Sequence, residues 1–83
     1  MWWFFLKESE TRNRITYRYS TDSDSLDGLI IYNRATDRST VFAPCRKDRQ
    51  DPWRRFRLDL TLERFERWIV WPGFPERQTV IVG

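Results

Sequence analysis

The chain has 83 residues, a formal net charge of +3, 33% charged residues and a mean hydropathy of −0.73. These values are typical of one globular domain over residues 1–83 and exclude a chain too polar to fold. There is no histidine and one cysteine, Cys45. The composition therefore excludes an internal disulfide, a zinc site built from His and Cys, and imidazole catalysis. We expect no cofactor and no enzymatic activity.

The first predicted element is a strand over residues 2–7, where two Trp, two Phe and one Leu precede Lys7. The apolar run is too short for a signal peptide or a membrane span, so we expect a cytoplasmic protein. A strand this apolar should lie centrally in a sheet, with one face toward a helix and the other covered by something else. Trp2 and Trp3 should point to opposite faces, and the less buried of the two should mark an interface.

Three further strands are predicted before any helix. Residues 14–19 alternate between apolar and polar side chains, which indicates a half-buried strand paired with the first one in a hairpin. A loop rich in Ser and Asp over residues 20–27 precedes a strand at 29–32, and a short strand follows at 40–42. Short connections between consecutive strands favour an antiparallel meander.

A long helix is predicted over residues 52–71, after a polar linker at 46–52. Asp51 and Pro52 are favourable residues for the N-cap and the first helical position. One apolar stripe at helical spacing would face the sheet, and it consists of Leu58, Leu62, Phe65 and Ile69. Apolar and polar side chains also alternate over residues 55–62, so a strand there stays an open alternative. The length of the uninterrupted stretch favours the helix.

The chain then turns at Pro72 and Gly73 and ends in a predicted strand over residues 78–82. The element order is β-β-β-β-α-β. The predicted fold class is α+β, with an antiparallel four- to five-stranded sheet and one long helix packed on one face.

Large aromatic residues exceed what such a fold needs for its core. Trp53, Phe56, Leu60 and Trp71 would lie on the side of the helix opposite the main stripe, and one sheet face cannot cover both sides. Aromatic residues and Arg are the usual anchors of protein interfaces. We therefore predict a surface for a protein partner, a homodimer being one form, that includes Trp2, Trp3, Trp53, Phe56 and Trp71.

Residues 46–57 combine cations with aromatic rings. Such a combination is typical of contacts with phosphates and stacked bases. The candidate nucleic-acid contacts are Arg46, Lys47, Arg49, Arg54, Arg55 and Arg57. The simpler alternative is a solvated loop and first helical turn with Trp53 and Phe56 docked inward.

Other site-like patterns are weaker. An EF-hand counted from Asp22 would place Leu26 at position five and Asn33 at position twelve, so the calcium-loop register fails. Cys45 lies beside Arg46 and Lys47, which favour thiolate, but no general base or second cysteine accompanies it. We predict neither a metal site nor a reactive cysteine.

Several short segments together resemble a group of short, uncharacterised bacterial proteins. They are Trp2-Trp3-Phe4, Leu26-Asp27-Gly28-Leu29-Ile30-Ile31-Tyr32, Pro44-Cys45 and Gly73-Phe74-Pro75. The resemblance implies a compact bacterial domain and supplies no function. The sequence thus predicts a non-enzymatic protein-interaction or regulatory domain, with a small nucleic-acid-binding protein as the alternative.

Overall fold

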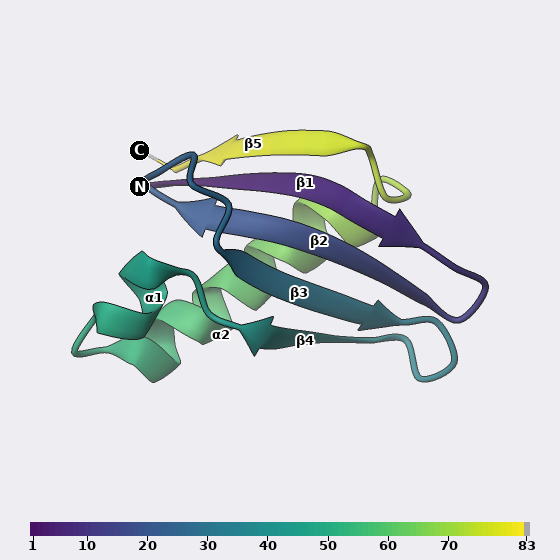
Figure 1. Ribbon diagram of the computed structural model, residues 1–83, viewed down its shortest axis with the longest axis horizontal. Helices are drawn as coiled ribbons and strands as arrows, with labels where there is room; N and C mark the ends of the chain where they lie inside the picture. The colour runs from purple at the N-terminus through teal and green to yellow at the C-terminus, as the bar shows by residue number, and fades with distance from the viewer. Residues whose placement is uncertain (83) are drawn as a thin grey trace.

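The computed structural model describes residues 1–82 and has one sheet layer and one helical layer (Figure 1). All strand pairs are antiparallel, in the order β4-β3-β2-β1-β5. The helical layer covers one face of the sheet, which confirms the predicted α+β class. The elements are β1 (Trp2–Glu10), β2 (Arg14–Thr21), β3 (Gly28–Asn33), β4 (Arg38–Ala43), α1 (Arg46–Gln50), α2 (Arg54–Phe65), a π-helical turn η1 (Glu66–Val70) and β5 (Arg77–Ile81).

The apolar N-terminal segment is an interior strand, as predicted. β1 forms a hairpin with β2 and pairs on its other side with β5. Trp3 and Phe5 point toward the helical layer and are buried, whereas Trp2, Phe4 and Leu6 alternate with them on the outer face and are half-buried. No element of residues 1–82 covers that outer face, so the chain itself does not supply the second cover that we expected.

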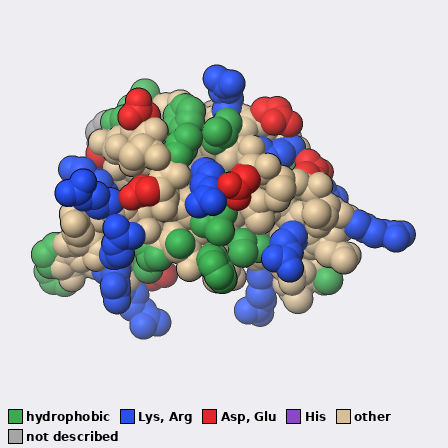
Figure 2. Space-filling view, viewed as in Figure 1, with side chains coloured by type: hydrophobic (Ala, Val, Ile, Leu, Met, Phe, Trp, Pro, Cys, Tyr) green, Lys and Arg blue, Asp and Glu red, His purple; other side chains and the backbone are tan. Residues whose placement is uncertain are grey.

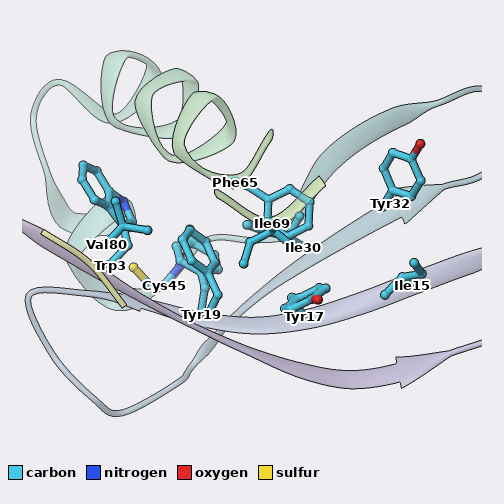
Figure 3. Packing of buried hydrophobic residues seen from close by; sticks show 11 residues of the cluster. Trp3, Ile15, Tyr17, Tyr19, Ile30, Tyr32, Cys45, Phe65, Ile69 and Val80 are labelled. Carbon is cyan, nitrogen blue, oxygen red and sulfur yellow. The ribbon is translucent and has the colours of Figure 1, made fainter. Parts of the chain in front are cut away.

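The core lies between the inner face of the sheet, mainly β1, β2 and β3, and the helical layer (Figure 3). Phe65 on α2 meets the rings of Phe5 and Tyr17 edge-on, with ring centroids 5.7 and 5.3 Å apart. Such aromatic pairs add stability beyond the area that they bury. Ile69 on η1 and Ile15 on β2 extend this apolar packing along the sheet.

The helical prediction was correct in kind and wrong in two details. Residues 55–62 are helical, so the strand alternative is wrong, and the predicted helix at 52–71 is resolved into α2 and η1. The linker predicted at 46–52 is wrong in part, because residues 46–50 form α1. η1 lies at the C-terminal end of the helical layer, and α1 lies at its N-terminal end.

The predicted apolar stripe is shifted by one residue at that end. The buried positions of α2 and η1 are Arg57, Thr61, Phe65 and Ile69. Leu58 and Leu62 are only half-buried, although we expected them to face the sheet. The physical reason is the buried carboxylate of Asp48, which lies under the first half of α2 and accepts hydrogen bonds from Arg57 and Thr61.

Helix and final strand are joined by the predicted turn. Gly73 has a φ of 98°, and its N–H and that of Phe74 donate to the carbonyls of Val70 and Ile69. A glycine with positive φ just after a helix satisfies its last carbonyl groups without steric cost. The turn places the Phe74 ring 4.9 Å from that of Tyr32 and starts β5 beside β1.

Candidate functional site

The first feature of the site is a buried carboxylate, Asp48 of α1, which is 0% exposed. It accepts hydrogen bonds from the hydroxyls of Tyr19 at 2.9 Å, Thr61 at 2.9 Å and Thr21 at 3.1 Å. The Arg57 guanidinium donates to it from Nε and lies 3.3 Å away through Nη2. A buried charge is tolerated when it is paired and hydrogen-bonded in this way.

The hydrogen bonds extend outward from Asp48 to neighbouring elements. Trp3 of β1 donates from Nε1 to the Thr61 hydroxyl at 2.9 Å, and the backbone N–H of Cys45 donates to the Tyr19 hydroxyl at 3.0 Å. The Tyr19 ring lies over Gly28. A Cβ atom at position 28 would be 2.3 Å from Cε1 of Tyr19, so no larger residue fits there without a shift of the ring. We call Trp3, Tyr19, Thr21, Asp48, Arg57 and Thr61 the Asp48 cluster.

Tyr19 is held in its neutral form by this environment. Burial raises the pKa of its phenol well above the ordinary value, and the carboxylate of Asp48 raises it further. The phenol therefore keeps its proton and donates a hydrogen bond to Asp48. Because every polar atom named in the cluster has a partner, the cluster serves to hold α1 and α2 against the sheet, and we assign it no reaction.

The outward side of α1 and the start of α2 is strongly basic. Its exposed cations are Arg46, Lys47, Arg49, Arg54 and Arg55. Neither acid of this segment is fully exposed. Asp48 lies buried in the cluster, and the half-buried Asp51 accepts the N–H of Trp53 at 2.7 Å and lies 3.8 Å from Arg57. Figure 2 shows Lys and Arg side chains gathered over this end of the molecule.

Two aromatic side chains stand among these cations. Trp53 is 75% exposed and Phe56 is 64% exposed, so the alternative in which both dock inward is wrong. Here we name the five exposed cations with Trp53 and Phe56 the basic corner. The prediction of Arg57 as a nucleic-acid contact is wrong, because its guanidinium is buried against Asp48.

A second aromatic pair lies at the other end of the helical layer. Trp71 is 74% exposed, at a position we had selected for a partner, and Trp68 of η1 is also exposed. Sequence reasoning missed Trp68, although its position three residues before Trp71 places both on one side of a helix. The prediction of Trp3 as a partner contact is wrong, because Trp3 is 1% exposed and donates a hydrogen bond to Thr61. Trp2 is half-buried and stays a candidate contact.

The outer face of the sheet is the second face of β1 for which the sequence predicts a cover, and Trp2, the less buried of the first two tryptophans, lies on it. Apolar side chains of β1 and β3 lie on it half-buried, and Arg18 of β2 donates to Glu8 across it at 2.8 Å. Figure 2, which views this face, shows hydrophobic side chains around a central pair of opposite charges. We define the outer face by its apolar residues Trp2, Phe4, Leu6, Leu29 and Ile31 and by the Glu8–Arg18 pair.

A polar hollow of about 380 Å³ lies between the β2–β3 loop and α1. Cys45 borders it but is 1% exposed, and its thiol donates to Thr21. The loop side chains bond to one another or to the backbone: Ser25 donates to Asp27, and Asp27 accepts the N–H of Arg46. These bonds tie the loop side to itself and to α1, whereas the α1 side of the hollow carries Arg46, Lys47 and Gln50.

Another loop acid, Asp22, accepts the backbone N–H of Trp2 at 2.9 Å and so ties the loop to the start of β1. Within residues 1–82, no three His, Cys, Asp or Glu side chains are grouped closely enough to hold a metal ion. The helices described are likewise all too short or too polar to cross a bilayer.

Comparison with known protein families, with curated proteins and with solved structures finds nothing that matches this chain. Its function is therefore argued from the basic corner, the outer face and the residues that hold them in place.

Proposed function

We propose that the protein is a small cytoplasmic interaction module without enzymatic activity, and that its outer face binds a second copy of the chain. The observation that carries the proposal is the uncovered apolar face of the sheet. An antiparallel sheet with one solvated face normally alternates apolar inward and polar outward. In β1 and β3 the outward positions carry Trp2, Phe4, Leu6, Leu29 and Ile31 instead.

The charges of the outer face favour a second copy over an unrelated partner. Glu8 and Arg18 lie side by side at its centre, so the centre of the face carries one charge of each sign. In a two-fold symmetric dimer the same patch meets itself, and each Arg18 can then approach the Glu8 of the other copy. The face is thus complementary to itself in charge as well as in its apolar character.

The size of the outer face also suits a dimer. The face viewed in Figure 2 spans the two longest extents of the molecule, 35 and 20 Å. A rectangle of these extents measures about 700 Å² and encloses the whole view, so this side of the molecule is of the same order as the ~800 Å² that each partner buries in a standard interface. Sheet-on-sheet packing of this kind would exclude water from the five apolar side chains.

The test is the mass in solution by sedimentation equilibrium. We expect the protein to sediment as twice its chain mass of 10.3 kDa at micromolar concentrations. Ile31→Lys should return it to the single-chain mass, because a buried unpaired charge is costly at an interface. The matched control is Ala35→Lys in the exposed β3–β4 turn, which should leave the dimer intact. A single-chain mass for the unmodified protein would refute the proposal.

Charge reversal separates self-association from simple loss of folding. Glu8→Arg and Arg18→Glu each leave two like charges at the centre of the outer face and should each prevent dimer formation. An equimolar mixture of the two variants should form a mixed dimer, since a positive face then meets a negative one. Variants that stay monomeric in the mixture would argue against contact between these faces.

A further inference from the structure

We infer that the basic corner binds single-stranded nucleic acid, with its cations on the phosphates and with Trp53 and Phe56 stacked on bases. This activity goes beyond the proposed dimer and uses a separate surface. A groove or ridge that combines cations with stackable rings is the general design of proteins that bind single strands without strong sequence preference. The basic corner provides both groups within a short stretch of α1 and α2.

This surface is basic because the two acids of residues 46–57 are engaged in hydrogen bonds within the chain. The Asp48 carboxylate accepts hydrogen bonds from the hydroxyls of the Asp48 cluster, and the Asp51 carboxylate accepts the N–H of Trp53 in the turn before α2. If either acid were exposed, it would pair with a neighbouring Arg and weaken the attraction for phosphate. Five exposed cations face solvent between residues 46 and 57. Of the two acids in this stretch, Asp48 is buried and Asp51 is half-buried.

The rings are free, and their backbone is fixed. Trp53 and Phe56 lie three residues apart at the first turn of α2, so both project from the same end of the helix. The neighbouring Arg57 anchors this turn by its bonds to Asp48 at 3.3 Å. A strand that binds there would therefore not have to order the backbone that carries the rings. Arg57 is thus a positioning residue and touches no nucleotide.

The residues favour a single strand over other polyanions. The bases of a duplex are already stacked on each other, whereas unpaired bases can stack on aromatic rings and guanidinium planes. Four of the five cations are Arg, which binds phosphate through paired N–H groups and also stacks. A lipid surface would require a continuous apolar face, but the exposed side of α2 carries Asp59 one turn beyond Phe56.

The first experiment measures binding of a fluorescent 20-nucleotide oligothymidine by anisotropy over 50 to 300 mM NaCl. We expect binding that weakens steeply with salt, because bound phosphates release counterions. Arg54→Ala with Arg55→Ala should reduce the slope of log affinity against log salt by about 1.4, at ~0.7 per single-strand phosphate contact. The matched control removes two cations at the far end of the sheet, Arg12→Ala with Arg38→Ala, and should change the slope far less.

The second experiment tests stacking. Trp53→Ala should weaken binding about tenfold or more, and Trp53→Phe should recover most of the affinity, because base stacking needs a ring and no particular polar group. Since Trp53 is exposed, both variants should keep the far-UV circular dichroism of the unmodified protein. A loss of affinity that Trp53→Phe does not recover would overturn the stacking assignment.

Competing polyanions decide the class of partner. A duplex of the same length, polyglutamate and vesicles containing phosphatidylserine should each bind at least tenfold more weakly than the oligothymidine. Equal or tighter binding of polyglutamate or vesicles, or oligonucleotide binding that Arg54→Ala with Arg55→Ala leaves unchanged, would overturn the inference. Sedimentation without nucleic acid tests the dimer by itself, so failure of one proposal is distinguishable from failure of the other.

Discussion

The two ends of the interface between helix and sheet solve the same packing problem in opposite ways. At the C-terminal end, Phe65 and Ile69 meet only apolar side chains and aromatic rings. At the N-terminal end, Arg57 and Thr61 occupy the same side of the same helix but meet Asp48 and its hydroxyl partners. Both ends are closed to water, one by the hydrophobic effect and the other by a complete set of hydrogen bonds.

The comparison shows what each kind of packing can do. Apolar packing tolerates many side chains of suitable volume, because dispersion and burial have little directional preference. The Asp48 cluster requires each partner in place, because a missing group leaves a buried polar atom unsatisfied. In return it fixes the direction of α1 and the first turn of α2, and these two elements carry the basic corner.

The largest effect on the free energy of unfolding is expected when Asp48, the central acceptor of the Asp48 cluster, is replaced. Asp48→Ala leaves the buried Arg57 guanidinium with only the more distant Asp51 carboxylate, 3.8 Å away, and removes the acceptor of three hydroxyls. We expect a loss of about 3–5 kcal/mol in the free energy of unfolding, measured by urea denaturation. Adding Arg57→Met should recover part of the loss. A cost below ~1 kcal/mol for Asp48→Ala would contradict the role given to the cluster.

A smaller effect is expected from one conservative substitution at each end, Thr61→Val in α2 and Ile69→Val in η1, which compares the two ends directly. Thr61→Val removes the donor to Asp48 and the acceptor of Trp3 Nε1, and should cost about 1–3 kcal/mol. Ile69→Val at the apolar end removes one methylene group and should cost about 0.5–1.5 kcal/mol. Urea midpoints with unchanged slopes would measure both. A larger cost for Ile69→Val would reverse the comparison.

The smallest effect at neutral pH concerns the buried phenols beneath the two ends. Burial raises the pKa of Tyr17 and of Tyr19 above the ordinary value of about 10. Above pH 10 the unfolded chain therefore releases protons that the folded chain retains, so stability is unaffected below pH 10 and falls as the pH rises further. Phenolate absorbance at 295 nm should appear together with the loss of circular dichroism. Phenolate that appears in the still-folded protein would contradict this.

Much of the fold was predictable because its signals are local. The alternation of residues 14–19 and the continuous apolar run at 2–6 predicted adjacent strands, and Phe65 and Ile69 were correctly assigned to the core. The continuous runs at 2–6 and 29–31 also contained the signal for the outer face. A strand without polar alternation is apolar on both sides, whatever lies over it.

The Asp48 cluster could not be predicted in the same way. Arg57 and Asp48 are residues that normally lie at the surface, so a hydrophobicity pattern assigns them there. Their partners, Tyr19 and Trp3, are distant in sequence, and no periodicity reveals such a pairing. For the same reason the sequence predicts a linker where α1 forms, and it predicts an exposed cation at the buried Arg57.

The pairing of Met1 with Val82 closes the described chain almost into a ring. The N–H of Val82 donates to the carbonyl of Met1 at 2.9 Å, and the two ends lie side by side in Figure 1. A linker of a few residues could therefore join them, and the chain could be opened instead in the exposed turn at residues 34–37. Such a circular permutant would keep every strand pair, the Asp48 cluster and the basic corner while moving both ends away from β1. Any label attached at its new ends would then stand opposite the basic corner.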